Sequence, residues 1–473
     1  MRPRTGCSAK ASDLLGHAPL TVMQKPVAAE IPYVDPLAAF APFAADPYCA
    51  FLDSAVTAGG RGRYSYICVD PVRVLAGSDV QRPFQDLRNL LGEISLTADP
   101  NLPPFQTGLC GVLGYELGGT IERLPPPKQG VDFPVLSAAL YDTIVAFDTV
   151  ARRAWVIGTD LTESRTPVAD RVGNLVSKLA ETSALPAAPT TQEAAWSWQL
   201  SSDEYRCAVA DAIEYIYAGD IFQANITARA DTPLPNGVSP FDLYRRLRHQ
   251  SPAPFAAYLR CGEDATLVSA SPERFLRVDA AGRISTRPIK GTRPRGTDAA
   301  ADAALAAELK ASPKDRAENL MIVDLLRNDL SRVAEIGSVE VSALCELETF
   351  ARVHHLVSEV NGVLRTDKDI FDLLIAAFPG GSVTGAPKVR AMEIIHELEP
   401  VARGPYCGSV FWAGADGQMD SSIVIRSLAV AGDTVHAHAG GGIVADSEPE
   451  RELDEMLTKA GPLLASVGGD GAS

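Results

Sequence analysis

The chain has 473 residues, of which 46% are hydrophobic, so it can bury a sizeable core without disulfides or structural metals. Its 43 lysines and arginines are outnumbered by 59 acids, and the net charge of -16 argues against binding to nucleic acid or to an anionic membrane. Eight scattered cysteines form no C-x-x-C pair, and no run of 18 apolar residues occurs. We therefore expect reduced thiols, no membrane span and a cytoplasmic protein.

The chain divides into regions of different pattern. Residues 1–22 show no sustained apolar period, and we expect them to form a disordered tail outside the fold. Within 23–182, alternating stretches such as RYSYICVD and YDTIVAFDTV predict strands of an antiparallel sheet. The segment 183–195, SALPAAPTTQEAA, combines small residues with two prolines, which is typical of a linker. It leads into a second region, 196–466.

The second region mixes helices with strands. Ser202 is placed to cap a first helix that Gly219 ends. Further helices are predicted at 299–311, 315–330, 369–378, 386–398 and 449–465, and strands at FAAYLR, ATLVSAS, SVEVSALCEL, SVFWAG and SIVIRSLAV. Because the order lacks a strict βαβ alternation, we predict an α+β fold: a large layered structure of mainly antiparallel sheets flanked by helices.

The stretch RPIKGTRPRG, residues 287–296, sets Lys290 close to Arg287, Arg293 and Arg295. Crowded positive charge favours a neutral amine, and a neutral amine is a nucleophile. The alternative is that all four cations are exposed on a surface turn, as charged residues mostly are.

Acids recur on two predicted helices. Glu318 falls in the first turns of one, and on the other Glu452 and Glu455 are three residues apart, with Lys459 four residues after Glu455. Such acids either form a solvated helix face or hold Mg²⁺, which takes one or two carboxylates together with water and substrate oxygens.

Two glycine-rich stretches invite different interpretations. FPGGSVTGAPKVRAME does not fit a nucleotide phosphate loop, because Pro387 removes a backbone donor and no Ser or Thr follows Lys388. The three glycines of HAGGGIVADS permit either the approach of a ligand or close packing against another strand. In RVHHLVSEVNG, we expect one of His354 and His355 to point inward and the other outward.

An ordered set of segments resembles the chorismate-utilising enzymes, which include anthranilate synthase component I, aminodeoxychorismate synthase component I, and the isochorismate and salicylate synthases. The segments span about residues 200–465 and are SPERF, RPIKGTRPRG, DRAENLMIVDLLRNDL, HHLVSEV, FPGGSVTGAPKVRAMEII, GPYCGSV, DSSIVIRSL and AGGGIVADSEPE. The N-terminal half carries the resemblance in FLDSA, GRYSYICVDP and GLCGVLGYELG.

This resemblance implies roles for particular residues. Mg²⁺ would be held by Glu318 and Glu455, with Glu452 close by, and would bind the ring carboxylate of chorismate. Glu273 of SPERF would protonate the departing 4-hydroxyl, and His355 matches the active-site histidine. Positions matching substrate-binding residues of the family are Arg426, Tyr406, Gly441, Gly442, Ser382, Thr292 and Lys459.

Two positions distinguish the branches of the family. Members that add water carry a lysine where this chain has Gln223, and glutamine there accompanies ammonia as nucleophile. Anthranilate synthases usually have PIAGT where this chain has PIKGT. The resemblance therefore implies an aminodeoxychorismate synthase component I, in which Lys290 attacks C2 of chorismate and ammonia then enters at C4, toward 4-aminobenzoate and folate. Anthranilate synthase component I is the alternative.

The resemblance also implies partners. Ammonia would come from a separate glutaminase subunit, because no cysteine lies in a G-x-C-x-G elbow of this chain. FLDSA and GRYSY resemble the part of the family that forms a tryptophan pocket, although LDS departs from the LES of feedback-regulated anthranilate synthases. A purely regulatory subunit is a third interpretation, which the presence of all the catalytic acids opposes.

Overall fold

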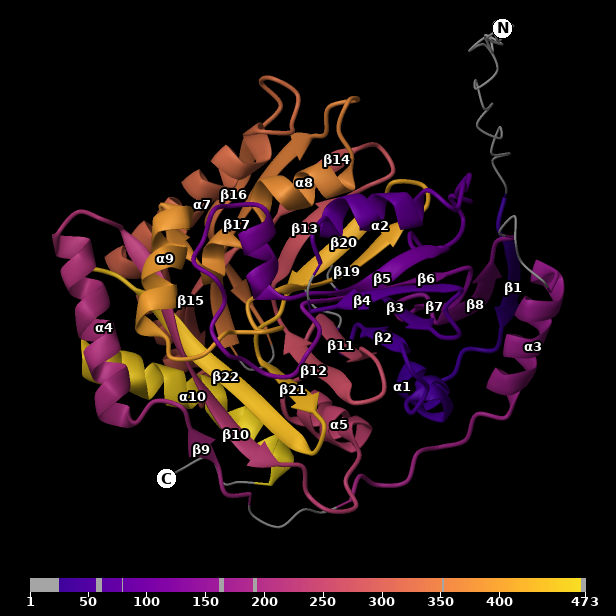
Figure 1. Ribbon diagram of the computed structural model, residues 1–473, viewed down its shortest axis with the longest axis horizontal. Coiled ribbons are helices and arrows are strands. Elements are labelled where there is room, and N and C mark those ends of the chain that lie inside the picture. The colour runs from indigo at the N-terminus through magenta and orange to yellow at the C-terminus, as the bar shows by residue number, and fades with distance from the viewer. Residues whose placement is uncertain are drawn as a thin grey trace, which may run out of the picture.

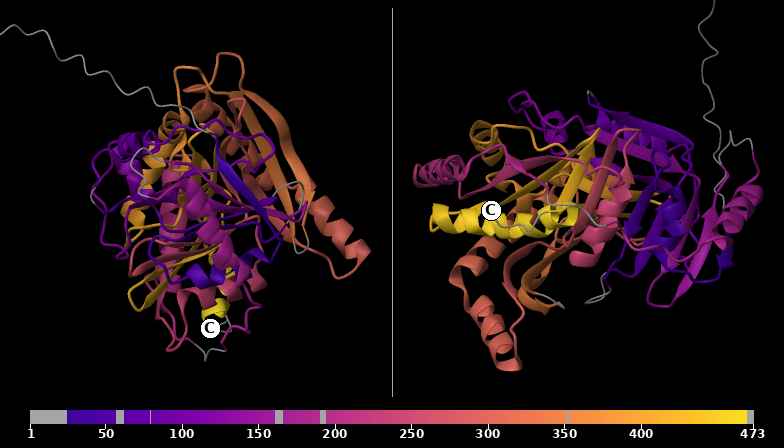
Figure 2. Two further views of the ribbon diagram at one scale, coloured as in Figure 1. Left: turned by 90° about the vertical axis from the view of Figure 1, so that its right-hand side faces the viewer. Right: turned by 90° about the horizontal axis from the view of Figure 1, so that it is seen from below.

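A computed structural model describes residues 25–56, 62–78, 80–160, 166–189, 194–350 and 353–468. The tail expected at 1–22 lies outside these residues, as does part of the expected linker, 190–193. Figures 1 and 2 show two large sheets with helices around them.

The first sheet has twelve strands, and its described pairs are antiparallel. One short strand, β9 (Ser197–Trp198), pairs with β10 beside the main path. The main path runs in the order β1 (Val27–Ile31), β8 (Arg153–Gly158), β7 (Thr143–Asp148), β3 (Tyr64–Cys68), β2 (Ala50–Asp53), β11 (Phe255–Arg260), β12 (Ala265–Ser271), β21 (Ser427–Ala431), β22 (Thr434–Ile443), β10 (Gln223–Pro233) and β18 (Gly385–Ala386).

The second sheet has ten strands and is also antiparallel in its described pairs. Here β16 (Glu340–Thr349) pairs with β17 beside the main path. The path runs in the order β15 (Ile289–Pro294), β17 (Val353–Val363), β14 (Arg283–Thr286), β13 (Arg274–Val278), β20 (Met419–Ile423), β19 (Ser409–Gly414), β5 (Gly108–Leu113), β6 (Leu136–Tyr141) and β4 (Arg73–Gly77).

Strands from both sides of the segment 183–195 take part in both sheets. In the first sheet, β2 from the N-terminal side pairs with β11 from the C-terminal side. In the second sheet, β5 pairs with β19 in the same way. The two regions of the sequence therefore share their hydrogen-bonded framework.

Three buried apolar clusters hold the sheets and helices together. The cluster between the sheets includes Tyr66, Phe105 and Trp412, and the Phe105 and Trp412 rings stack at 5.1 Å. The cluster outside the first sheet is covered by α1 (Pro36–Phe40), α3 (Val168–Ala180), α4 (Ser202–Tyr217), α5 (Pro240–Gln250), α9 (Lys388–Leu398) and α10 (Pro449–Val467). The cluster outside the second sheet is covered by α2 (Pro83–Leu91), α7 (Pro313–Ser331) and α8 (Ile370–Ala377).

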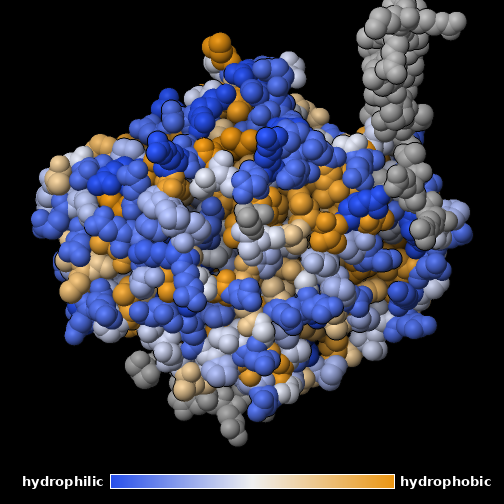
Figure 3. Space-filling view, in the orientation of Figure 1, coloured by the Kyte–Doolittle hydropathy of each residue, from blue (hydrophilic) through white to orange (hydrophobic). Residues whose placement is uncertain are grey.

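Short elements complete the structure. Leu309 of α6 (Ala299–Ala311) is buried with Cys345 and Leu356 in a small cluster beside β16 and β17. The 3₁₀ helices are η1 (Ala41–Phe43), η2 (Tyr115–Thr120) and η3 (Gly381–Val383). In space-filling view, apolar residues gather toward the middle of the face drawn in Figure 1, with hydrophilic residues along its rim (Figure 3).

The predicted fold class is confirmed: large, mainly antiparallel sheets are flanked by helices. Two local predictions were wrong. The cap of α4 is Ser201, not Ser202, and it forms a capping box with Glu204. The predicted strand SIVIRSLAV is broken into β20 and β21, because Arg426 between them adopts a left-handed backbone with φ 54°.

Two findings concern the expected environment of the protein. No helix among the described residues is long and apolar enough to cross a membrane. The seven cysteines within the described ranges are all free thiols.

Candidate active site

Lys290 lies where the edge strand of the second sheet meets the first sheet. Its Nζ donates to the carbonyl oxygen of Ser382 in η3 at 3.3 Å. A Cβ placed on Gly442 of β22 would lie 3.2 Å from this Nζ and 2.7 Å from Nε2 of Gln223 at the start of β10. Four of the predicted site residues, distant in sequence, therefore converge on one point.

The three arginines near Lys290 in sequence do not surround it with unbalanced charge. Each forms ion pairs with acids of neighbouring elements. The expectation that uncompensated positive charge crowds around Lys290 was therefore wrong. The pairs are Arg287 with Glu348 at 2.5 Å and Glu359 at 3.1 Å, Arg293 with Glu308 at 2.8 Å and Asp315 at 3.3 Å, and Arg295 with Asp302 at 2.7 Å.

Glu273 immediately precedes β13 and is only 5% exposed. Burial raises the pKa of its carboxyl to about 7, against the opposing effects of a hydrogen bond from Ser382 and of the Lys290 charge. A carboxyl that retains a proton near neutral pH can act as a general acid. Its electrostatic coupling to Lys290 places it in the same cluster.

Gln223 is fully buried, yet neither Oε1 nor Nε2 of its side chain has a hydrogen-bond partner among the described residues. Buried amides are nearly always hydrogen-bonded, because leaving such a group unpaired costs about 1–3 kcal/mol. An unpaired amide beside Lys290 is therefore poised to bind a ligand.

The triple glycine serves both of the purposes considered from sequence. A Cβ on Gly440 would lie 2.2 Å from the backbone oxygen of Ile226, so this glycine allows close packing of β22 on β10. A Cβ on Gly441 would instead lie 3.2 Å from Oε2 of Glu452 and 3.7 Å from Oε1 of Glu455. Gly441 and Gly442 thus leave space beside chemically active side chains.

Glu318 and Glu452 lie on two different helices, α7 and α10. Burial raises the pKa of Glu318, opposed by Lys290 and Lys314. Its carboxyl forms no hydrogen bond or ion pair with any residue in the described ranges. Glu452 is buried and accepts from Lys314 at 3.3 Å and from Ser447 at 2.7 Å.

Glu455 and Lys459 form the ion pair expected from their spacing, at 2.6 Å. The side chain of Glu455 is 54% exposed. Partial burial raises its pKa, but the charges of Lys459, Lys314 and Lys290 together hold the pKa below its usual value. Lys459 also donates to the carbonyl of Gly440 at 2.8 Å, and its own carbonyl accepts from Arg426 at 3.0 Å. The C-terminal helix is therefore tied directly to β22 and to Arg426.

The acids suit a magnesium ion that also binds substrate. Within the described residues, no three His, Cys, Asp or Glu side chains are close enough to hold a metal by themselves. Mg²⁺ needs only one or two carboxylates when waters and substrate oxygens complete its shell. The unpaired carboxyl of Glu318, electrostatically coupled to Glu452, provides such a donor set.

Arg426, which is half-buried, and Tyr406, which is buried, form a wall of the cluster. Burial lowers the pKa of Arg426, whose charge is opposed by no carboxylate within ion-pair distance among the described residues. Burial also raises the pKa of Tyr406, whose ring stacks on His438 at 5.0 Å. A half-buried guanidinium without an acid partner among the described residues is suited to bind a carboxylate of a ligand.

Thr292 and His355 lie at the edge of this arrangement. They pair across β15 and β17, and Oγ1 of Thr292 is 2.8 Å from Nδ1 of His355. His354 is buried and contacts Asp302 at 2.9 Å, which confirms that one of the two histidines points inward. Thr292 lies on β15, the strand that also carries Lys290, and β17 places His355 beside it.

Sequence reasoning missed a buried ion pair behind the cluster. Arg403 and Glu399 contact at 2.6 Å, and Arg403 also donates to the carbonyl of Val383 at 2.9 Å. Glu399 accepts from the backbone and hydroxyl of Thr227, each at 2.9 Å. The four-residue spacing of the pair was a signal in the sequence, but its burial was not.

A separate cavity of about 370 Å³ is lined by residues of both FLDSA and GRYSY together with residues from 254–278 and 410–422, and is called the N-terminal cavity below after the first two segments. Two acids that line it, Asp53 and Asp420, form ion pairs with arginines. Asp53 binds Arg248 and the hydroxyl of Tyr244, and Arg274 binds Asp420 at 2.8 Å.

The fold and the cluster together define a chorismate-utilising enzyme. A family profile described as chorismate binding enzyme matches residues 51–465, and the chain belongs to this family. More narrowly, it is of the type represented by anthranilate synthase component 1 and aminodeoxychorismate synthase component 1.

Three comparisons illustrate this. Anthranilate synthase component 1 of Streptomyces coelicolor is 41% identical, over 92% of this chain and 86% of that protein. Aminodeoxychorismate synthase component 1 of Klebsiella aerogenes is 38% identical, over 90% of this chain and 95% of that protein. The crystal structure of anthranilate synthase component I from Streptococcus pneumoniae superposes with a TM-score of 0.76 at 29% identity, over 85% of this chain and 92% of that one.

Proposed function

We propose that this chain is an aminodeoxychorismate synthase component I, which converts chorismate and ammonia to 4-amino-4-deoxychorismate. One observation carries the proposal: the amine of Lys290 lies beside the unpaired amide of Gln223, against the space left by Gly442. A lysine at this point supplies a nucleophile inside the substrate site, and the resemblance described above associates lysine here with this branch.

The reaction would proceed by two displacements. The Lys290 amine attacks C2 of chorismate, the ring double bonds shift, and the C4–O bond breaks as Glu273 gives its proton to the departing hydroxyl, which leaves as water. Ammonia then attacks C4, the C2–N bond breaks, and the Lys290 amine is released, while the proton lost by the new nitrogen returns to Glu273. Two easier steps replace one difficult substitution.

The remaining residues would orient the substrate. Arg426, Tyr406 and the backbone of Gly441 and Gly442 bind its carboxylates, and Gln223 binds ammonia or the departing group. Ser382, Lys459, Thr292 and His355 complete the polar surroundings.

Mg²⁺ would be held by Glu318 and Glu455, with Glu452 beside them. When bound, the metal would neutralise and fix the ring carboxylate of chorismate. Lys314 and Lys459, which pair with Glu452 and Glu455, keep these acids in place. Ammonia would come from a separate glutaminase subunit.

Anthranilate synthase component I is the second candidate, because a relative of that name is 41% identical to this chain. Purified protein incubated with chorismate, ammonium chloride and Mg²⁺, followed by chromatography and mass analysis, separates the two. We expect 4-aminobenzoate to appear only after an aminodeoxychorismate lyase is added. Formation of anthranilate and pyruvate would contradict the proposal.

Tryptophan is the ligand that we propose for the N-terminal cavity. The cavity contains the aromatic side chains of Tyr64, Tyr66 and Trp412. Titration calorimetry with tryptophan should give saturable heat, and wild-type heat from a variant with Ser54 changed to Trp would contradict binding there. We further propose that the protein works in the cytoplasm.

A further inference from the structure

The glycine-rich segment 378–387, called the serine loop below, connects α8 to α9 and reaches into the Lys290 cluster. The carbonyl of Ser382 in this loop accepts from Nζ of Lys290 at 3.3 Å. The hydroxyl of the same serine donates to the carboxyl of Glu273. One residue of the serine loop therefore contacts both the proposed nucleophile and the proposed acid, so the position of the loop sets how these two groups face each other.

Lys388 closes the serine loop at its two ends. It is the first residue of α9, and its Nζ donates to the carbonyl oxygen of Ala377, the last residue of α8, at 2.6 Å. The same Nζ pairs at 2.8 Å with Oδ2 of Asp329, in the last turn of α7, and the two side chains are only 11% and 4% exposed. A single buried ammonium thus joins three helices at the base of the loop, and it is already occupied by these partners.

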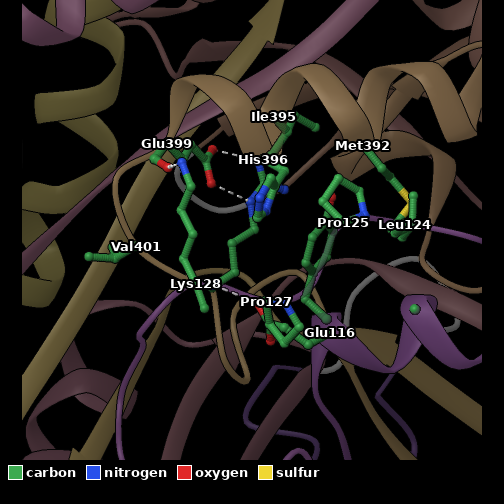
Figure 4. Close-up of a pocket in the computed structure, with 14 residues that line it drawn as sticks. Glu116, Leu124, Pro125, Pro127, Lys128, Met392, Ile395, His396, Glu399 and Val401 are labelled. Carbon is green, nitrogen blue, oxygen red and sulfur yellow. Dashed lines mark hydrogen bonds and ion pairs between the residues drawn. The ribbon is translucent and has the colours of Figure 1, made fainter.

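Arg403 holds the middle of the serine loop. Its guanidinium donates to the carbonyl of Val383 at 2.9 Å and to the carbonyl of Asn225 on β10. Glu399 lies just past the end of α9 (Figure 4) and neutralises the guanidinium through two bonds, at 2.6 and 2.9 Å. Arg403 is 1% exposed, so this contact is also buried.

The two buried ion pairs matter for geometry more than for stability. Desolvation of buried charges offsets their attraction, and apolar residues of similar volume often replace such a pair without loss of stability. Each cation here also holds a backbone carbonyl at one end or in the middle of the serine loop. Because a displacement of about 1 Å in a reacting group can lower a rate by about 10²-fold, contacts that fix this loop can affect turnover strongly.

We propose that Lys388 and Arg403 are positioning residues that hold the serine loop, so that Ser382 keeps Glu273 and Lys290 aligned for the first displacement. This inference rests on the proposed function, from which it takes the roles of the acid and the nucleophile. Both cations act through Ser382 and not by contact with the substrate. The lysine that follows the glycine-rich stretch in the sequence thereby gains a purpose other than binding phosphate.

The main test replaces the Lys388 pair by apolar side chains. Lys388→Met combined with Asp329→Leu leaves no charge buried alone, so the double variant should unfold at a temperature close to that of the wild type. Its kcat should nevertheless fall by about 10²-fold, because the loop loses the contact that closes it. The KM for chorismate should change far less, since Arg426 and Gly441, which are proposed to bind the substrate, lie outside the loop. Steady-state rates and thermal unfolding measure both effects.

The pH dependence of kcat separates positioning from a general loss of structure. Burial raises the pKa of Glu273 to about 7, opposed by the hydrogen bond from Ser382 and by the charge of Lys290. If the loop shifts and this hydrogen bond is lost, the pKa rises further, and the fall of kcat moves to higher pH in the double variant. Ser382→Ala should shift the profile in the same direction. Combining it with the double variant should add little, because both changes remove the same bond.

A matched control lies at the opposite end of the first sheet from β22 and β10. Arg171 of α3 pairs with Asp142 at 3.1 Å, and the two side chains are 17% and 4% exposed. Like Lys388, it also donates to a backbone carbonyl, that of Thr159, at 2.9 Å. Arg171→Met combined with Asp142→Leu should therefore leave kcat and its pH dependence as in the wild type.

Arg403→Lys provides a second test that does not depend on the folding of the double variant. An ammonium cannot reproduce the planar guanidinium that bonds Glu399, Val383 and Asn225 at once. The kcat of Arg403→Lys should fall by about tenfold or more, and its pH profile should shift in the same direction. Arg171→Lys, the same substitution far from the cluster, should change neither.

The outcomes separate the two proposals. Unchanged kcat and pH dependence in the folded double variant and in Arg403→Lys, with wild-type amination of chorismate intact, would overturn the positioning role alone. Full additivity between Ser382→Ala and the double variant would also contradict it, since the cations would then not act through Ser382. If wild-type protein consumes no chorismate with ammonium, the proposed function fails and the positioning role fails with it.

Discussion

The Lys290 cluster and the N-terminal cavity both contain polar side chains, but they differ in how these polar groups are satisfied. In the cavity, Asp53 is 1% exposed and is bound by Arg248 and Tyr244. In the cluster, the amide of Gln223 is buried without a partner, and Glu318 forms no ion pair with a described residue. Paired polar groups stabilise the fold, whereas unpaired polar groups can bind a substrate. Substitutions should therefore cost stability at the cavity and activity at the cluster.

The largest loss of activity should follow from removing the amine. Lys290→Ala should lower the rate of 4-amino-4-deoxychorismate formation by at least about 10³-fold, because the first displacement loses its nucleophile. Its thermal unfolding temperature should stay close to that of the wild type. Lys310→Ala, at an exposed lysine of α6, serves as the control. If Lys290→Ala turned over at the wild-type rate, Lys290 could not be the covalent nucleophile.

A smaller loss is expected at the general acid. Glu273→Gln should lower kcat by about 10²- to 10³-fold. Because the pKa of Glu273 is raised to about 7 and the protonated form is the one that reacts, wild-type kcat should fall as pH rises through that value. Rates measured from pH 6 to pH 9 check this, and a kcat that rises across the range would contradict the assignment.

A third substitution should act through the metal. Glu318→Gln should raise the Mg²⁺ concentration needed for half-maximal activity by about tenfold or more, because it removes an unpaired carboxylate donor. Titration of EDTA-treated protein with MgCl₂ measures the shift. The exposed acid variant Glu335→Gln should titrate like the wild type. Equal half-saturation in both variants would remove Glu318 from the metal site.

The smallest effect on activity is expected at the cavity. Asp53→Asn leaves Arg248 without its charge partner and should lower the free energy of unfolding by about 3 kcal/mol. Turnover below the unfolding transition should remain near that of the wild type. Chemical denaturation measures the loss, with Asp211→Asn, at an exposed position of α4, for comparison. If Asp53→Asn were as stable as the wild type but turned over more slowly, the proposed difference between the cavity and the cluster would be contradicted.

Local pattern was sufficient for much of the fold. The helices predicted at 299–311 and 449–465 match α6 and α10 to within two residues. α6 is rich in alanine, the strongest helix former, and α10 buries one face. The break at Arg426 was not predictable, since a left-handed residue in an apolar run leaves no periodic signal.

The site was harder to predict than the fold. The ordered motifs named residues that do converge, such as Lys290 and Ser382. The pairing of Arg287 with Glu348 depends on strands that only the tertiary fold brings together. The closeness of Arg287 to Lys290 in the sequence therefore gave a wrong prediction of the charge around Lys290. The unpaired atoms of Gln223 and Tyr115 follow from packing on every side, which a single sequence does not encode.

The most direct test of the central claim is a search for the covalent intermediate. Wild-type protein would be mixed with chorismate and Mg²⁺ without ammonium, quenched in acid, digested and analysed by peptide mass. The account predicts that the peptide carrying Lys290 gains the mass of chorismate less one water, and that Lys290→Ala shows no such gain. Unmodified Lys290, in protein that forms product once ammonium is added, would contradict it.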